Sequence, residues 1–379
     1  MKKHKEECSS TTKRQEKIKV DAFIQNIHKF RDDYLSDASA PNEKVVIFDE
    51  AQRAWDQHQT SKFMQQKKGK IGFSMSEPEF LLSVMDRHDD WCAVVCLVGI
   101  GQEINTGEAG ISEWLRALER SFPHWLAHAP TQLSSLTNCI LHNVQTTQAT
   151  ALHLETCIRS FRSERLSDFV GLVIDGNAAA ASQMAASLCD YNVFLTRDLQ
   201  HARAWLRKNC RGSERMGLLA SSNAARLKPE GIFVKSKIDP VNWFLAPSDD
   251  VRSSNALEDT ATEFDVQGLE LDWACMCWDA NFRRSLSSTG DRGGGWQACL
   301  FKGSKWQRVN DDARKSFVAN SYRVLLTRAR QGLVVFVPFG NLDGSDVTRP
   351  PEIYDDIYAY LQRCGVRQLP ACESSEMVQ

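Results

Sequence analysis

Short apolar runs alternate with helix-like segments along most of this sequence, and this alternation limits the fold more than any other feature. Strand-like runs lie at 45–48, 91–99, 151–155, 192–196, 216–221, 272–278, 297–301 and 332–338. Helical patterns lie at 20–35, 76–88, 110–122, 163–176, 179–190, 198–209, 311–330 and 350–364. Strands that alternate with helices favour a parallel, doubly wound sheet. We therefore expect an α/β fold built on parallel sheets.

The domain organisation follows from length and from two changes in composition. The chain has 379 residues, of which 42% are hydrophobic, so it can form two or three domains with cores of their own. Residues 1–17 are polar and basic without an apolar period, which is typical of a flexible arm. The Pro-, Thr- and Gln-containing region 130–150 is typical of a crossing between domains. We predict a first domain over 18–149 and a second over 150–379.

Bulk charge, cysteines and hydropathy narrow the class of protein. Lys and Arg number 46 and Asp and Glu 48, so the formal net charge of −2 gives no overall basic field. The 12 cysteines lack Cys-x-x-Cys spacing, which favours buried thiols in a reducing compartment over a zinc or redox site. The charged N-terminus has no apolar signal-peptide core, and no later apolar run has the length of a membrane span. We expect a cytoplasmic protein with no membrane partner.

The stretch VVIFDEAQ places two acids directly after a buried strand. Asp49 would then emerge at the carboxyl end of the strand, where a carboxylate holds Mg²⁺ through water, and Glu50 beside it would orient a water on a γ-phosphate. The alternative is an ordinary strand followed by the N-terminus of a solvated helix, where acids are also favoured.

A glycine-rich loop, LVGIGQEINTGEAG, belongs to the next apolar run and its continuation. Its Gln102 side chain both donates and accepts hydrogen bonds, as a γ-phosphate sensor must. The alternative is a glycine-rich turn before a helix.

Arginines follow in two later segments, LHLETCIRSFR and SYRVLLTRARQG. Arg159, or its competitor Arg162, and the pair Arg328 and Arg330 are candidates to neutralise charge on a transferred phosphoryl group. Taken singly, each is more often a surface arginine or one in the last turn of a helix.

The order of these segments carries a resemblance. DEAQ, the Gln loop, L-x-x-x-I-R-S, Q-G-L-E-L-D-W and L-L-T-R-A-R resemble motifs II to VI of superfamily 1 helicases, in that succession. On FDEAQRAW, GQEINTGEAG and LLTRAR, the chain is similar to the Schlafen group 3-type DNA/RNA helicase-like domain family over roughly residues 18 to 340.

The resemblance implies roles for the acidic and catalytic residues. Asp49 would be associated with Mg²⁺ through water, and Glu50 would be the base that positions the attacking water. Gln102 would sense the γ-phosphate, which Arg159 and Arg328 would face.

The resemblance also implies nucleotide contacts and an architecture. Gln52, Gly268, Glu270 and Arg330 would contribute to nucleotide binding, with Glu270 touching either the nucleotide or the other domain. Two RecA-like parallel-sheet domains would bind ATP and Mg²⁺ between them and single-stranded DNA or RNA across their top.

The sequence contains no G-x-x-x-x-G-K-[ST] phosphate-binding loop. Its Gly69–Lys70 pair has Met64 where the first glycine should stand and Ile71 where the hydroxyl should. Such a loop supplies most of the triphosphate cradle, and the resemblance puts it on a strand and helix before DEAQ. We therefore expect the first domain to be incomplete and ATP hydrolysis by this chain alone to be weak or absent.

Two classes of function remain open. The chain is either the carboxyl-terminal portion of a nucleic-acid-dependent ATPase, whose loop comes from an upstream segment or a partner chain, or a non-hydrolysing module that binds nucleic acid or protein. Trp243, Phe244, Trp296 and Trp306 are candidates for base stacking in the second case. Core or loop packing is the favoured interpretation of these four aromatic side chains.

Overall fold

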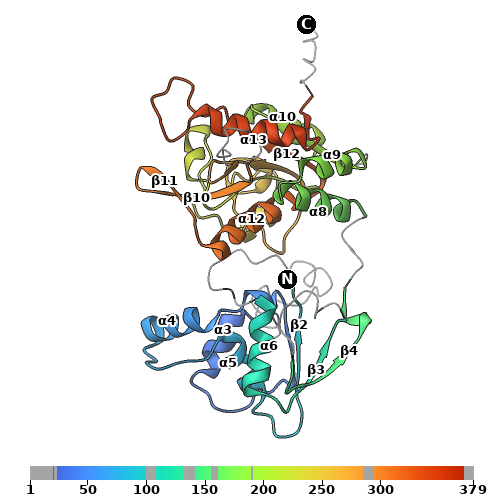
Figure 1. Cartoon of the computed structure of the whole chain (residues 1–379), viewed down its shortest axis with the longest axis vertical. Helices are drawn as coiled ribbons and strands as arrows, with labels where there is room; N and C mark the ends of the chain where they lie inside the picture. Colours follow the sequence, from blue (N-terminus) through green and yellow to red (C-terminus); the bar gives the residue numbers. More distant parts are fainter. Residues whose placement is uncertain are drawn as a thin grey trace. The chain divides into compact units, whose positions relative to one another are not determined.

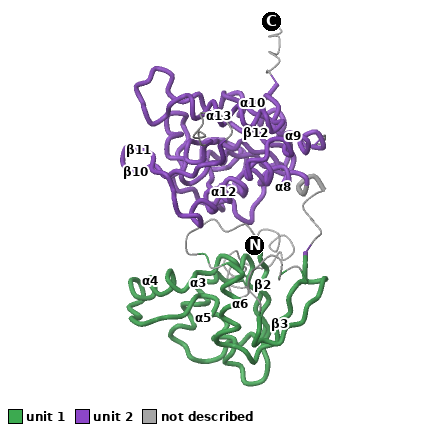
Figure 2. Tube along the Cα trace, in the orientation of Figure 1, with its two compact units in different colours: residues 1–103, 107–153 green, residues 104–106, 154–379 purple. Residues whose placement is uncertain are grey.

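The computed structural model describes residue 20 and residues 24–99, 108, 110–131, 133, 141–154, 161–188, 191–284 and 294–370. The chain forms two compact units, the first of residues 1–103 and 107–153 and the second of residues 104–106 and 154–379 (Figure 2). The predicted α/β class is confirmed, because helices cover parallel sheets in both units. The predicted arm 1–17 lies outside the described residues.

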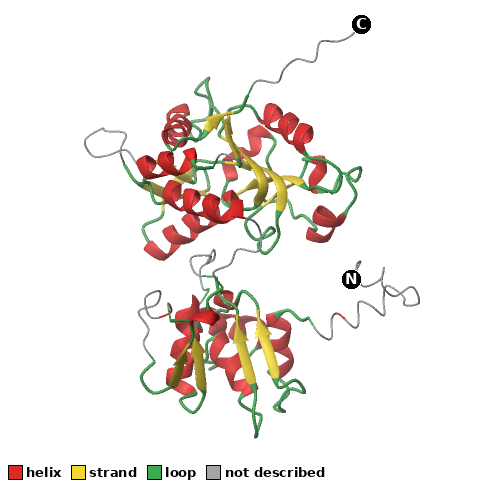
Figure 3. Ribbon diagram, turned by 90° about the vertical axis from the view of Figure 1, so that its right-hand side faces the viewer, coloured by secondary structure: helices red, strands yellow, loops and turns green. Residues whose placement is uncertain are grey.

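The first unit contains two separate pairs of parallel strands. Its elements are α3 (Ile27–Tyr34), β1 (Val45–Phe48), η1 (Ala51–Arg53), α4 (Gln57–Lys68), α5 (Glu77–Met85), β2 (Ala93–Cys96), α6 (Gly110–Ser121), β3 (Leu126–Ala129), β4 (Gln145–Gln148) and η2 (Thr150–Leu152). β1 pairs with β2 and β3 with β4, and among the described residues no backbone ladder joins the two pairs. Figure 3 shows them as two sets of arrows within this unit.

Described residues cover only one face of the β1–β2 pair. Phe48 at the end of β1 packs with Leu81 of α5 and Trp114 of α6 in the core of this unit. On the opposite face the exposed side chains are Val45, Ile47, Val95 and Leu97, with exposed fractions of 49%, 63%, 42% and 39%. Parallel sheets are normally buried on both faces, so this face is an apolar surface without a covering helix among the described residues.

A buried ion pair joins three elements of the first unit. Arg31 of α3 and Glu77 of α5 are 1% and 0% exposed, and their Nη1 and Oε1 atoms lie 2.8 Å apart. Glu77 Oε2 also accepts from the backbone N–H of Trp55, in the loop after β1, at 2.9 Å. The Arg31 guanidinium lies over the rings of Trp55 and Phe63, at 5.1 and 4.6 Å. The pair therefore fixes α3, α5 and the loop after β1 to one another.

A second carboxylate of α5 ties this helix to α6. Glu79 accepts from Arg120 Nη2 at 2.6 Å and from the Ser121 hydroxyl at 2.6 Å. Burial alone would raise the pKa of Glu79, but the guanidinium and the hydroxyl hold it below its ordinary value. Stabilisation from this contact is therefore present above the unfolded-state pKa and is lost as the pH falls through the folded-state pKa.

The second unit is built on a six-stranded parallel sheet with the order β13-β5-β12-β8-β6-β7. Figure 1 labels β12 of this sheet. The helices of this unit are α8 (Phe161–Ile174), α9 (Ala178–Ala186), α10 (Leu199–Asn209), η3 (Ala225–Glu230), α11 (Pro240–Leu245), η4 (Ser254–Ala256), α12 (Asp312–Leu326) and α13 (Pro351–Arg363). Its sheet strands are β5 (Asn192–Thr196), β6 (Met216–Ala220), β7 (Thr260–Ala261), β8 (Leu271–Cys277), β12 (Ala329–Phe336) and β13 (Arg367–Gln368). A separate antiparallel sheet contains β9 (Phe282–Arg284), β10 (Trp296–Lys302) and β11 (Lys305–Arg308).

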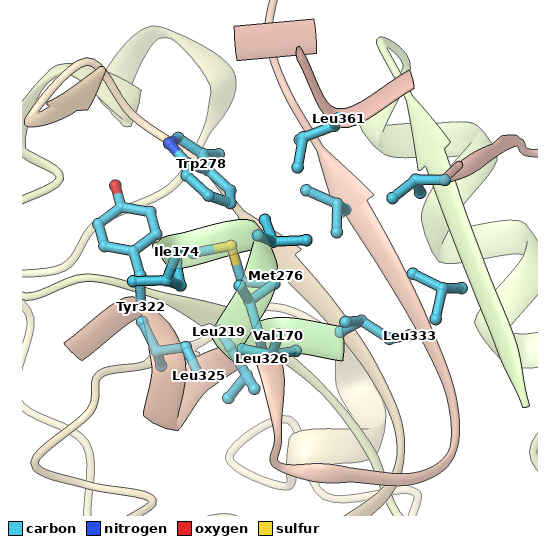
Figure 4. Close-up of a cluster of buried hydrophobic side chains, with 14 of the residues drawn as sticks. Val170, Ile174, Leu219, Met276, Trp278, Tyr322, Leu325, Leu326, Leu333 and Leu361 are labelled. Carbon is cyan, nitrogen blue, oxygen red and sulfur yellow. The ribbon is translucent and has the colours of Figure 1, made fainter. Parts of the chain in front are cut away.

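Hydrophobic cores cover both faces of the six-stranded sheet. Met276 of β8 packs with Val170, Leu333 and Leu361 in one core, drawn in Figure 4. The preceding residue of β8, Cys275, points to the opposite face and belongs to the other core, which includes residues of α10 and η3. The residues of β8 thus alternate between two cores, as expected for a central parallel strand.

Most predicted elements are confirmed, and two predictions are wrong. No strand covers the described part, 151–154, of the strand predicted over 151–155, because Thr150–Leu152 forms a 3-10 turn. The helix predicted over 311–330 ends at Leu326, because Ala329 pairs with Leu271 of β8 and begins β12. In the region 130–150, which was predicted to cross between domains, residues Gln145–Gln148 form β4, and the division between the two units falls after residue 153.

One predicted helix starts later than its pattern, and α4 covers a segment for which no helix was predicted. α3 begins at Ile27, because the Asn26 side chain accepts from the backbone N–H of His28 at 2.8 Å and caps the helix there. Gly69 ends α4 in a left-handed conformation with φ 65°, so the Gly69–Lys70 pair forms a helix terminus.

A substitution at Gly332 of β12 tests how closely this strand packs against Trp273. A Cβ there would lie 2.5 and 2.8 Å from Trp273 Cζ3 and Cε3. We expect Gly332→Ala to lower the free energy of unfolding by about 1–3 kcal/mol in chemical denaturation, because the buried indole must shift. Gly171→Ala in α8, where the new Cβ meets nothing within 4 Å, is the control and should be neutral or stabilising. Equal losses in both variants would contradict this packing.

The Arg31–Glu77 pair is tested by a double-mutant cycle. We expect Arg31→Met to lower the free energy of unfolding by about 3 kcal/mol, because it leaves the Glu77 carboxylate buried without its guanidinium. Glu77→Leu should also destabilise, since Trp55 N–H loses its acceptor. The double variant should lose less than the sum of the two single losses in denaturant unfolding. Additive losses would show that the two side chains do not interact.

Candidate functional site

The loop after β1 holds an acidic residue in a strained backbone conformation. Glu50 has φ 53° and ψ 40°, in the left-handed region that residues with a side chain rarely adopt. Its Oε2 accepts from Gln52 Nε2 at 2.7 Å, and Gln52 Oε1 accepts from the backbone N–H of Gly99 at 3.1 Å. Gln52 is buried, so its amide connects the acidic loop to the segment after β2.

Asp49 lies at the carboxyl end of β1 with an exposed side chain. Its Oδ1 accepts from the backbone N–H of Glu50 at 3.0 Å. Mg²⁺ in nucleotide sites is bound by one or two carboxylates together with phosphate and water, so an exposed carboxylate at this strand end fits the ion that the resemblance implies. Among the described residues no group of three or more His, Cys, Asp or Glu side chains suits a metal.

Backbone and indole contacts hold the start of this loop. The N–H of Ala51 donates to Leu97 O at 2.9 Å, and Trp114 Nε1 donates to Ala51 O at 2.8 Å. The Trp114 ring also packs on Phe48, with ring centroids 5.5 Å apart. Trp114 was predicted only as part of a helix, because nothing local in the sequence shows that its indole reaches the loop after β1.

Part of the predicted site lies outside the described residues. Gln102 and Arg159 fall there, and for Arg162 only the backbone is described, in α8. Glu108 is described. Its backbone forms an isolated antiparallel β-bridge with Trp55, and its Oε1 lies 3.5 Å from Arg53 Nε.

Four predicted residues of the second unit come together at the amino ends of β8 and β12. Arg328 is 4% exposed, and its guanidinium donates to Val324 O at 3.1 Å and to Leu269 O at 3.4 Å. Arg330 is half-exposed, and its Nε lies 3.4 Å from Glu270 Oε2. Gly268 precedes them with φ 76°. Arg330, rather than Arg328, therefore presents the more accessible guanidinium.

The opposite end of the second sheet contains two buried carboxylates that sequence reasoning missed. Burial raises the pKa of both Asp279 and Glu263. Asp279 nevertheless accepts from the backbone N–H groups of Arg226 and Ala280 at 2.9 and 2.7 Å and from the Tyr354 hydroxyl at 2.9 Å. These donors occupy the carboxylate, so Asp279 acts as an anchor for three segments. No sequence motif identifies Asp279, because the donors Arg226 and Tyr354 are distant from it in the sequence.

The aromatic candidates for base stacking are packed. Trp243 is fully buried, with Phe244 beside it at 4.7 Å between ring centroids. Trp296 stacks on Phe282 at 4.5 Å, and Trp306 Nε1 donates to Thr348 O at 2.8 Å. These contacts agree with the interpretation of the four side chains as core and loop packing.

Comparison with known proteins places the chain in a family. The family described as Schlafen group 3, DNA/RNA helicase domain, matches residues 1–338. A search of curated proteins found no match. None of the described helices combines the length and apolar character that crossing a bilayer requires. With its α/β units and this match over most of its length, the chain belongs to the Schlafen group 3 DNA/RNA helicase domain family.

Proposed function

We propose that this chain is the helicase-like portion of a nucleic-acid-dependent ATPase and acts with a phosphate-binding loop on a further polypeptide segment. The observation that carries the proposal is the strained Glu50, whose carboxylate is held by the buried Gln52 amide at the carboxyl end of β1. Backbone strain in a residue with a side chain persists where surrounding contacts fix it, and it is concentrated at active sites.

The acidic loop has a chemical role for each residue. When bound, MgATP would supply the electrophilic γ-phosphorus and neutralise charge on its oxygens. Asp49 would hold the ion through water, and Glu50 would accept a proton from the attacking water. Gln52 would keep Glu50 in place through the 2.7 Å hydrogen bond between its Nε2 and Glu50 Oε2.

Residues from the rest of the chain would address the phosphates and the nucleotide. Gln102 would sense the γ-phosphate, and Arg159 and Arg328 would stabilise the charge that develops on it. The half-exposed pair of Arg330 and Glu270, next to Gly268, would contribute nucleotide contacts. Because Arg328 is hydrogen-bonded to backbone carbonyls, its guanidinium would have to leave Val324 and Leu269 to act.

The phosphate-binding loop is the part that this sequence does not contain. The apolar face of β1–β2 formed by Val45, Ile47, Val95 and Leu97 has no cover from the described part of the chain, which supports the proposal that a further strand and helix pack there. A loop between that strand and helix would lie next to Asp49, at the carboxyl edge of the sheet. An upstream segment or a partner chain would carry it.

A non-hydrolysing binding module is the second candidate. The engagement of Arg328 with backbone carbonyls favours it, since an arginine in that position stabilises the fold without any nucleotide. The second unit, whose sheet is covered on both faces, would then bind single-stranded nucleic acid or protein.

ATP turnover separates the two candidates. We expect the 379-residue chain alone to show background turnover, and a form extended by a strand, G-x-x-x-x-G-K-[ST] loop and helix to show turnover stimulated by single-stranded DNA or RNA. In the extended form, Glu50→Gln should reduce turnover by roughly 100-fold or more, because it removes the general base. Glu43→Gln, an exposed acid before β1, is the control and should keep full activity. An inactive extended form, or an active Glu50→Gln variant, would favour the binding module.

The strain at Glu50 gives a separate test that needs no nucleotide. Glu50→Asn should leave the free energy of unfolding within about 0.5 kcal/mol of the parent, because asparagine tolerates the left-handed region, whereas Glu50→Val should lower it by roughly 1–2 kcal/mol. The same two changes at Glu43, which has an ordinary φ, should differ little. Denaturant unfolding measures all four variants. Equal stabilities of the two Glu50 variants would show that the left-handed conformation is absent in solution.

A further inference from the structure

The antiparallel sheet of β9, β10 and β11 is a strongly basic part of the second unit. It lies between β8 and α12 in the chain, and Figure 1 shows the β10–β11 hairpin projecting from the side of this unit. Described residues 282–284 and 294–309 include five basic side chains and no acidic one. In a chain whose formal net charge is −2, this segment is a local concentration of positive charge.

The base of this sheet is fixed to the core, so the hairpin is a rigid projection. Trp296 stacks on Phe282 and Trp278, and its Nε1 donates to Val173 O at 2.9 Å. On the other side Trp306 packs against Phe301, with ring centroids 5.2 Å apart. A positioned backbone lowers the conformational entropy that its side chains lose on binding a partner.

The charges on the hairpin lack compensation. Lys302, Lys305 and Arg308 are exposed, and none of them forms an ion pair with a described residue. Lys302 and Lys305 lie directly opposite each other across the two strands, an arrangement that destabilises a hairpin. By contrast, Arg226, which lies over the ring of Phe301, is paired with Asp346. Lys302 and Lys305 lie on one face of the hairpin, and Arg308, which is opposite Cys299, lies on the other face. Unpaired like charges on a rigid element suit a polyanion, and the repulsion between the two lysines is relieved when the polyanion binds.

We propose that the β10–β11 hairpin binds the phosphate backbone of nucleic acid through Lys302, Lys305 and Arg308. This inference rests on the proposed function, which supplies the nucleic-acid partner, and adds the surface that holds it. Lysine and arginine contacts of this kind position a strand without reading its sequence. The aromatic residues of the hairpin are engaged in packing, so binding is predominantly electrostatic and sensitive to salt.

The test is the binding of a fluorescein-labelled 20-nucleotide single-stranded DNA or RNA to the full chain, measured by fluorescence anisotropy at 50 and 200 mM salt. The variant is Lys302→Gln/Lys305→Gln/Arg308→Gln. Arg207→Gln/Lys208→Gln/Arg211→Gln, which removes three exposed charges at the end of α10, is the matched control. Circular dichroism and thermal unfolding verify that both variants fold.

We expect the hairpin variant to bind roughly tenfold or more weakly at 50 mM salt, and its slope of log affinity against log salt to be shallower by about 2, because three phosphate contacts are lost. The control should bind like the parent chain. Equal affinities of the hairpin variant and the parent would overturn the assignment while leaving the proposed function intact. Failure of the parent chain itself to bind at 50 mM salt would overturn both.

Discussion

The buried pair of Arg31 and Glu77 is the contact on which the first unit depends. Both side chains are removed from water, so neither charge is tolerated without the other. Glu77 uses its second oxygen to hold the Trp55 backbone, at the far end of the loop that begins at Asp49. At the near end Trp114 holds Ala51 O. A loop restrained at both ends can keep Glu50 in a conformation that it would leave if it were free.

The two units differ in how completely they cover their sheets. In the second, the residues of β8 alternate between two cores, and Ala274, Cys275 and Met276 are fully buried. In the first, Ile47 of β1 remains 63% exposed while its neighbour Phe48 is buried. VVIF carries apolar residues on both faces, which is the composition of a strand buried on both sides, yet one side has no cover among the described residues.

How far the sequence predicted the fold depended on whether the signal was local. The strands 192–196 and 216–220 were located because their apolar runs are continuous and bounded by turn residues. β4, with the sequence QTTQ, has no apolar residue and was missed. The end of α12 was placed too late because the pairing of Ala329 with Leu271, a contact distant in sequence, decides where β12 begins.

The residues of the candidate site also fall into those with a local sequence signal and those without one. Asp49 and Glu50 were identified from a strand followed by acids, and Gln52 came with the resemblance. The connection of Gln52 to Gly99, the indole of Trp114 below the loop, and two of the three donors on Asp279, Arg226 and Tyr354, depend on residues 47 to 75 positions apart. No periodicity in a single segment encodes such contacts, so only the folded chain could reveal them.

The polar clusters around Asp279 and around the pair of Glu270 and Arg330 differ in whether a ligand can replace a protein partner at small cost. Asp279 is fully buried and accepts from three donors within the fold, and replacing any of these donors by a ligand would leave a buried polar group unsatisfied. The pair of Glu270 and Arg330 is half-exposed at the amino end of the sheet, where an ion pair contributes little to stability. A phosphate could therefore replace Glu270 as the partner of Arg330 at small cost to the fold. Of these two clusters, the one at the amino end of β8 and β12 is therefore suited to a charged ligand, and the cluster around Asp279 is not.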